Sequence, residues 1–217
     1  MKNHLKRQSV PKNWPISRKG TKYVARPNSD AEGGIPLVII VRDMLNVAKN
    51  TKEVKRAIHM KNILVNNKRI NDEKMALSLF DTITIIPLKK NYRLSLSDKG
   101  KFALDEIKEN EANSKISKIL NKKMLKGKKT QLNLMDGRNF LSEAKCEVND
   151  SVVINFKEKK IEKCIPLQEK MRALVFAGKH TGKKGTLKKI DKEKQMVELE
   201  SGKENLHVLI KQIIAAE

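Results

Sequence analysis

Acidic residues are the scarce component of this sequence, and none precedes Asp30. The 217 residues include 25 Asp and Glu against 47 Lys and Arg, which gives a formal net charge of +22 and a sequence pI of about 10.0. A lysine-rich surface of the heat-adapted kind usually balances lysine with glutamate, so this imbalance argues against that explanation. Because so large a charge repels itself in a compact chain, we expect a polyanionic partner, with nucleic acid first among the polyanions.

Cysteines, aromatic residues and long apolar runs are also few. Cys146 and Cys164 are the only cysteines and form no CxxC pair, so the sequence supports neither a disulfide scaffold nor a zinc ribbon and fits a reducing cytoplasm. An aromatic content of 4% argues against binding of single strands by base stacking and favours recognition of folded RNA through phosphates and shape. The apolar stretch 35–41 ends at Arg42, well short of the roughly 18 residues of a membrane span, and the first residues contain no apolar signal core.

Residues 1–35 are basic and interrupted by prolines, which disfavour a long helix. We interpret the segment as a basic arm that becomes ordered against a polyanion. The alternative is a disordered tail without a specific role. Trp14 and Tyr23 weigh against that alternative, because disordered arms tend to lack aromatic residues.

Residues 36–61 predict two helices. The apolar residues of 37–47 indicate a mostly buried helix. A second helix is expected from Thr51, which we interpret as its N-cap, to about residue 61. Val54, Ala57 and Ile58 form its inner stripe, with Met60 as a further candidate, and basic residues fall largely on the other side.

Turn signals and β-branched runs predict strands in the rest of the chain. Asn66-Asn67 and Asp136-Gly137 each predict a tight hairpin. Strands are expected at residues 81–86, 92–96, 102–107, 115–120, 130–134, 139–141, 151–155 and 160–167. Short strands with frequent turns suggest a small central barrel. The lysines of 122–129 predict a basic loop that contacts phosphate, or alternatively one that stays solvated.

Residues 170–217 predict a small SH3-like barrel around a loop rich in glycine and lysine. Three residues separate Gly178 from Gly182, and the lysine that follows is succeeded by Lys184 instead of Ser or Thr. A Walker A loop needs a different spacing and that hydroxyl, so binding of ATP or GTP is not expected. We interpret the loop as a cradle in which backbone N–H groups and lysines bind RNA phosphate.

No pattern of catalytic or metal-binding residues stands out. The four histidines are scattered, and none has a cysteine or carboxylate at metal-ligand spacing. We therefore expect no enzymatic activity, no metal, no cofactor and no small-molecule substrate.

Two segments carry a family resemblance. Residues 51–68, TKEVKRAIHMKNILVNNK, resemble the S4 RNA-binding domain, in which a basic helix and the following hairpin bind structured RNA. Residues 175–190 resemble a KOW motif, found in ribosomal proteins and transcription elongation factors. In this order, and together with HLKR at 4–7, PKNW at 11–14 and QLNLMDGR at 131–138, they resemble the S4e family of archaeal and eukaryotic ribosomal proteins over nearly the whole chain.

This resemblance implies a cytoplasmic structural component of the small ribosomal subunit that supports subunit assembly and translation. Its implied partners are the subunit's 16S-type ribosomal RNA and neighbouring small-subunit proteins, with no membrane. Met135 departs from the family pattern, where a histidine is expected, and residues 28–34 are less basic than the family's usual loop. The chain ends soon after the KOW segment, which favours an archaeal source over a eukaryotic one.

The prediction is thus an α+β multi-domain protein with a basic N-terminal extension (1–35), an S4-like α+β module (36–88), a central β-barrel-like domain (89–169) and a KOW barrel (170–217). The residues predicted to bind RNA are Lys2, His4, Lys6, Arg7, Lys12, Trp14, Arg18, Lys19, Lys22, Arg26, Arg42, Lys49, Lys52, Lys55, Arg56, His59, Lys61, Lys68, Arg69, Lys122, Lys123, Lys126, Lys128, Lys129, Arg138, Lys179, His180, Lys183 and Lys184. Asp136-Gly137-Arg138 is either a specific feature of the central domain or simply a good hairpin turn.

Two other functions are weighed against this one. An RNA-modifying enzyme with an S4 module, such as a pseudouridine synthase, needs a further catalytic domain, and residues 90–217 leave no room for it. A transcription elongation factor that uses its KOW domain would copurify with RNA polymerase instead of with ribosomes.

Overall fold

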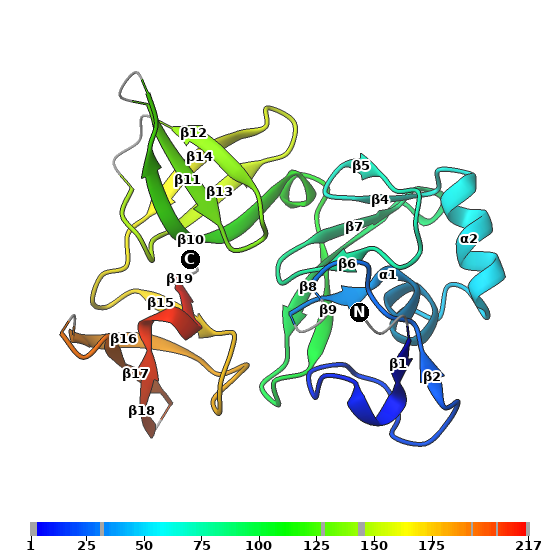
Figure 1. Cartoon of the computed structure of the whole chain (residues 1–217), viewed down its shortest axis with the longest axis horizontal. Coiled ribbons are helices and arrows are strands. Elements are labelled where there is room, and N and C mark those ends of the chain that lie inside the picture. The colour runs from blue at the N-terminus through cyan, green and yellow to red at the C-terminus, as the bar shows by residue number, and fades with distance from the viewer. Residues whose placement is uncertain are drawn as a thin grey trace. The chain divides into compact units, whose positions relative to one another are not determined.

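The computed structural model describes residues 4–30, 33–126, 129–142, 146–191, 193–202 and 204–215. The chain forms two compact units: the first comprises Met1–Ser95 and Lys101–Asn113, and the second comprises Leu96–Gly100 and Ser114–Glu217. Most of the regular structure is β-strand, with few helices (Figure 1). The first unit therefore continues past the boundary expected at residue 88.

The basic arm is folded in its described part. β1 (Leu5–Lys6) pairs antiparallel with β2 (Tyr23–Val24), and a 3-10 turn, η1 (Arg7–Ser9), follows β1. Trp14 is buried, and its indole Nε1 donates a hydrogen bond to the Gly34 carbonyl at 3.1 Å. The Phe102 N–H donates to the Asn13 carbonyl at 2.8 Å, and the Asn28 N–H donates to the Lys74 carbonyl at 3.0 Å. The alternative of a disordered tail is therefore wrong for these residues, because these bonds join the arm to the rest of the first unit.

The first predicted helix is shorter than expected. It consists of α1 (Leu37–Ile39) and a π-helical turn, η2 (Ile40–Met44). The chain leaves the helix at Asn46, which has φ 53°, so Val47 lies 45% exposed and not in the core as predicted. Before α1, β3 (Ile35–Pro36) pairs with β6 (Ala76–Leu77).

The second predicted helix is confirmed as α2 (Thr51–His59). Its N-cap is Asn50 and not Thr51, because the Asn50 side chain accepts a hydrogen bond from the Glu53 N–H at 3.0 Å. The Glu53 carboxylate in turn accepts one from the Lys49 N–H at 2.7 Å, which satisfies a second backbone donor at this end. Val54 and Ile58 are buried, as the helical spacing predicted, whereas Ala57 is half-buried and Met60, beyond the last turn, is 55% exposed.

A five-stranded sheet with the order β5-β4-β7-β8-β9 completes the first unit. Its strands are β4 (Ile63–Val65), β5 (Lys68–Arg69), β7 (Thr82–Ile85), β8 (Lys90–Leu96) and β9 (Phe102–Ile107). The 3-10 turn η3 (Ile86–Leu88) joins β7 to β8, and η4 (Glu111–Asn113) follows β9. The predicted hairpin is confirmed, since Asn66 and Asn67 have φ of 50° and 58° between β4 and β5.

The second unit contains two five-stranded sheets. The central sheet has the order β12-β11-β10-β13-β14. Its strands are β10 (Ser114–Met124), β11 (Thr130–Leu134), β12 (Asn139–Ser142), β13 (Ser151–Asn155) and β14 (Lys160–Ile165). The hairpin predicted at Asp136-Gly137 joins β11 to β12, with Gly137 at φ 79°. Ile119, Leu132 and Val152 are among its buried core residues.

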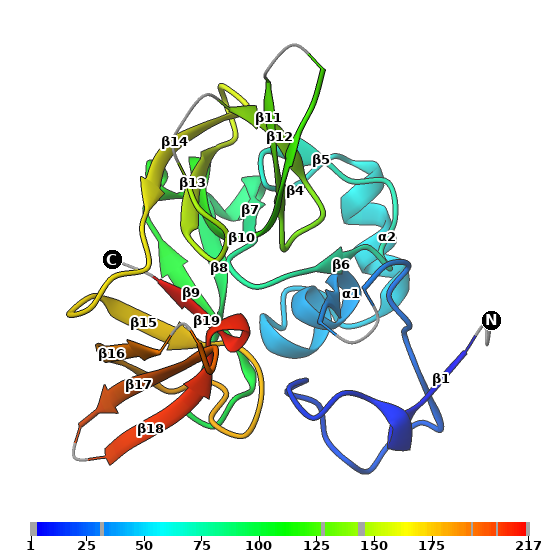
Figure 2. The ribbon, with the colours of Figure 1, turned by 60° about the vertical axis from the view of Figure 1, so that its left-hand side comes forward.

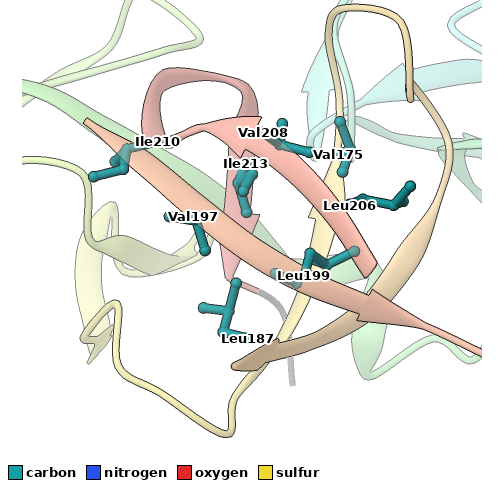
Figure 3. Packing of buried hydrophobic residues seen from close by; sticks show 9 residues of the cluster. Val175, Leu187, Val197, Leu199, Leu206, Val208, Ile210 and Ile213 are labelled. Carbon is teal, nitrogen blue, oxygen red and sulfur yellow. The ribbon is translucent and has the colours of Figure 1, made fainter. Parts of the chain in front are cut away.

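The C-terminal sheet has the order β18-β17-β16-β15-β19. Its strands are β15 (Arg172–Val175), β16 (Lys184–Asp191), β17 (Met196–Ser201), β18 (Glu204–Leu209) and β19 (Ile213–Ala215), with the 3-10 turn η5 (Ile210–Gln212) before β19. Alternate residues of β17, Val197 and Leu199, point into a core shared with Leu187, Val208 and Ile213 (Figure 3).

A buried lysine connects the two sheets of the second unit. Lys118 on β10 is fully buried, and its Nζ donates hydrogen bonds to the carbonyls of Ile210 and Ile213, the latter at 2.7 Å. Burial lowers the pKa of Lys118 to about 8. The Ile210 carbonyl also accepts from the Ile213 N–H, so the amine adds a second donor there and supplies one to the Ile213 carbonyl.

The lowered pKa of Lys118 predicts a rise in stability at alkaline pH. Between about pH 8 and pH 10.5 the unfolded chain retains a proton that the native state has released, so the free energy of unfolding increases with pH. At about 1.4 kcal/mol per pKa unit, the gain approaches roughly 3 kcal/mol. Urea denaturation at pH 7 to 10 gives the free energy of unfolding of the native chain and of Lys118→Met. We expect the value for the native chain to rise with pH relative to that of the variant. The same pH dependence in both proteins would contradict the prediction.

Candidate RNA-binding surfaces

The basic residues of α2 lie on one exposed face. Lys52, Lys55, Arg56 and His59 follow the i, i+3, i+4, i+7 spacing and are all exposed, while Val54 and Ile58 face the core. The hydrophobic stripe of the helix thus turns four predicted RNA-binding side chains outward together.

A groove of about 450 Å³ lies between α2 and the chain around and after β5. It is lined by Lys55, Ile58, His59, Lys61, Arg69, Ile70, Asn71 and Glu73. Glu73 is its acidic residue and pairs with Lys55 at 3.2 Å. Within the described ranges, no acidic side chain pairs with Lys52, Arg56, Lys61, Lys68 or Arg69. The groove and its rim therefore carry an uncompensated positive charge.

A buried polar network fixes the hairpin that carries Lys68 and Arg69. The Asn66 amide donates to the Asp81 carboxylate at 2.8 Å and accepts from the Thr82 N–H at 3.0 Å. The Thr82 hydroxyl donates to the Ala112 carbonyl at 3.0 Å. Sequence reasoning took Asn66 for a turn residue and missed this network, because each of its hydrogen bonds joins residues 15 to 30 positions apart along the chain. Because this network already fixes the hairpin backbone, binding through Lys68 and Arg69 costs little conformational entropy of that backbone.

The arm presents a second basic surface. A hollow of about 410 Å³ is lined by Lys6, Arg7, Gln8, Arg18, Lys19, Gly20, Thr21 and Lys22. Arg7 is structural in part: its guanidinium donates to the Ser17 carbonyl at 2.8 Å and to the Thr21 carbonyl at 2.7 Å. It therefore shapes the loop on which Arg18, Lys19 and Lys22 stand exposed.

Other predicted residues of the first unit differ in how freely they can meet a ligand. Trp14 is buried, so its ring is a packing anchor and does not line a surface, contrary to the prediction. Arg42 forms a bidentate pair with Asp43, at 2.7 and 2.8 Å, and these hydrogen bonds raise its pKa. His4 packs edge-on against Tyr23 at 5.3 Å between ring centroids. Of the other residues predicted to bind RNA, Lys12 and Lys49 are exposed, and Arg26 is half-buried.

The β10–β11 hairpin is a third basic surface. Lys122, Lys123, Lys126 and Lys129 are all exposed, and the Nζ of Lys122 also donates to the Cys146 carbonyl at 3.0 Å. Two predicted residues, Lys2 and Lys128, lie outside the described residues. The basic surface described for this hairpin therefore consists of the other four lysines.

The Asp136-Gly137-Arg138 turn is built around an ion pair. Asp136 contacts the buried Lys115 at 3.2 Å and the Arg138 Nε at 3.5 Å. The Arg138 guanidinium also stacks over the Phe156 ring, 4.9 Å from its centroid. Arg138 thus packs the turn onto the central sheet and is only half-exposed.

In the loop from Gly178 to Lys183, three of the backbone N–H groups that the sequence assigned to a phosphate cradle already have acceptors in the protein. The N–H groups of Thr181, Gly182 and Lys183 donate to the carbonyls of Gly178, Val175 and His180. These N–H groups therefore cannot also face a phosphate. Lys179 and Lys184 are exposed, His180 is half-buried, and Lys183 pairs with Glu204 at 2.6 Å, which lowers the pKa of Glu204.

Nothing in the described part of the chain resembles a metal site: no three His, Cys, Asp or Glu residues gather there.

Burial raises the pKa of the Cys164 thiol to about 12, which keeps it protonated. No helix among the described residues is long and apolar enough to cross a membrane.

Comparison with known proteins identifies relatives along most of the sequence. The model of the ribosomal family S4e matches residues 88–161, and that of the RS4NT (NUC023) domain matches residues 1–29. A small ribosomal subunit protein eS4 from Methanocella arvoryzae is 40% identical over 87% of this chain and 81% of its own length. The eS4 protein of Nanoarchaeum equitans is 35% identical over 88% of this chain and 84% of its own length. The crystal structure of the 30S ribosomal protein S4e from Thermoplasma acidophilum superposes with a TM-score of 0.73 at 25% identity, covering 85% of this chain and 95% of that one.

Proposed function

The chain belongs to the S4e family of ribosomal proteins and is a structural protein of the small ribosomal subunit, and we propose that it binds the subunit's ribosomal RNA through basic surfaces on both compact units. The proposal rests on the groove beside α2, which basic side chains line from both the helix and the hairpin. Glu73 is the acidic residue of its lining, and it is paired with Lys55. Ribosomal RNA is the polyanion that such a family member meets.

Each segment has a proposed role. The arm (1–35) lies along RNA, α2 and the Asn66-Asn67 hairpin act as an S4-type module within residues 36–88, and the central sheet forms a barrel-like module within 89–169. Residues 170–217 act as a KOW-type barrel whose contacts come from the Lys179 and Lys184 side chains. Several weak sites on one chain reinforce each other through effective concentration, so the protein could fix separate RNA segments during assembly.

The proposed surroundings follow from the family. The partners are 16S-type ribosomal RNA and neighbouring small-subunit proteins, and the location is the ribosome in the cytoplasm. S4e is a family of ribosomal structural proteins and not an enzyme class, which disfavours the pseudouridine synthase alternative.

Sedimentation of a native lysate in sucrose gradients tests the proposal. Magnesium is lowered to separate the subunits, and the chain is detected in each fraction at about 50 and about 200 mM salt, a range over which nonspecific binding falls steeply. We expect the chain to migrate with the small subunit at both salt concentrations. Its presence only in light fractions, or its release at the higher salt, would overturn the proposal.

A further inference from the structure

The face of β10, β11 and β12 that points away from the core carries two rows of side chains, all polar except Leu141. Asn121 pairs in register with Asn133, which pairs with Asn139. Lys123, Gln131 and Leu141 form the next row on the same face, because they lie two residues further along each strand. Leu132, on the opposite face, is fully buried in the core. The three strands lie side by side in the sheet (Figure 2).

These amides have unused hydrogen-bonding capacity. Among the described residues, the Nδ2 groups of Asn121, Asn133 and Asn139 donate to no protein acceptor. The contacts present are local: Gln131 donates to the Asn133 Oδ1 at 2.7 Å, and the Asn121 Oδ1 accepts from the Lys122 N–H at 2.7 Å. Asparagine is disfavoured in strands, so a row of three across neighbouring strands lowers stability, and the local hydrogen bonds of these amides do not explain the row.

The charge around this face indicates the class of partner. Between Ser114 and Ser142 the sequence contains one acid, Asp136, and it is paired with the buried Lys115. Lys123, Lys126 and Lys129 stand exposed at the end of the same hairpin. A ligand that satisfies both the lysines and the amides is a polyanion that also carries hydrogen-bonding edges, which describes RNA with unpaired bases.

We propose that this face binds a single-stranded, adenine-containing segment of RNA, with the lysines on the phosphates and the amides of Asn121, Asn133 and Asn139 on the base edges. Adenine offers a side-chain amide an adjacent donor and acceptor on two edges, N6–H with N7 and N6–H with N1, whereas unpaired cytosine offers one such pair, N4–H with N3. Leu141, which is 62% exposed beside Gln131, offers an apolar surface to the face of a base. The inference rests on the proposed RNA-binding function and adds to it a base preference.

Nuclear magnetic resonance of the ¹⁵N-labelled full chain provides the test. The probes are octamers of adenylate and of cytidylate, with inorganic polyphosphate as a polyanion that lacks bases. We expect the side-chain amide signals of Asn121, Asn133 and Asn139 to shift with the adenylate octamer and not with polyphosphate, and the adenylate octamer to bind about tenfold more tightly than the cytidylate octamer. The double variant Asn133→Ala/Asn139→Ala should bring the two affinities within about twofold of each other.

A charge variant and the signals of α2 separate the possible outcomes. Lys123→Ala/Lys126→Ala should weaken both octamers by a similar factor and leave the adenine preference intact. If the signals of Lys52 and Arg56 shift with RNA while the three asparagines do not, or shift equally with polyphosphate, the inference is wrong and the proposed function stands. If no basic surface responds to RNA, the proposed function fails as well.

Discussion

Replacing Lys52, Arg56, Lys68 and Arg69 together with alanine is expected to weaken binding of small-subunit ribosomal RNA about a thousandfold. All four side chains are exposed, and none has an acidic partner among the described residues, so each is free to meet a phosphate. At about 1 kcal/mol for each lost contact the sum is about 4 kcal/mol, which corresponds to that factor in the dissociation constant. The plot of log affinity against log salt concentration should also become shallower by about three units.

The control removes the same charge from another place. Lys157, Lys160, Lys194 and Lys211 are exposed, and changing them to alanine also lowers the net charge by four. Filter binding or fluorescence anisotropy at several salt concentrations measures both variants against the native chain. Because the altered side chains are exposed, the free energy of unfolding of both variants should stay within about 0.5 kcal/mol of the native chain. Equal weakening by the control would mean that total charge, and not the groove beside α2, determines affinity.

The parts of this surface that could be predicted from sequence are the local ones. The stripe of Val54 and Ile58 places Lys52 and Arg56 outward whatever the rest of the fold does, since helix geometry alone fixes their separation. The Asn66-Asn67 turn likewise places Lys68 next to Val65 across a two-residue hairpin. The groove itself needs the distant Glu73 and Asn71, and no local pattern indicates that they lie beside His59.

Buried lysines show where local patterns are insufficient. In the segment KISK of β10, both Lys115 and Lys118 have the appearance of solvent-exposed strand residues, yet both are buried. Asp136 pairs with Lys115 from the next hairpin, and the carbonyls that accept from Lys118 lie more than 90 residues away. A charged side chain can be buried only when such partners are supplied by tertiary structure, and this information is absent from its neighbours in sequence. The same reason applies to the arm, because the Asn13 carbonyl accepts from the Phe102 N–H, a partner that no local pattern indicates.

The loop at Gly178–Lys183 shows that a glycine can serve packing within the protein as well as the approach of a ligand. The glycines were interpreted as allowing close approach of a phosphate. They do allow a close approach, but to the protein's own backbone: a Cβ at Gly182 would lie 2.0 Å from the Ser97 carbonyl oxygen and 2.9 Å from the Gly100 nitrogen. Ser97 and Gly100 belong to the same compact unit as Gly182. The glycine therefore packs this loop against the turn at residues 97–100.

Changing Gly182 to alanine is accordingly expected to destabilise the chain by about 4 kcal/mol. Its φ of +92° costs an L-residue about 1–3 kcal/mol, and the contact with the Ser97 backbone can be relieved only by moving one of two packed segments. Gly137→Ala is the matched control, because Gly137 has φ +79° and no atom within 4 Å of its added Cβ, so it should lose only the conformational part. Urea denaturation followed by circular dichroism compares the two. Equal losses in the free energy of unfolding for Gly182→Ala and Gly137→Ala would contradict this prediction. They would show that the contact with Ser97 does not require glycine at residue 182 and would favour the phosphate interpretation of the loop.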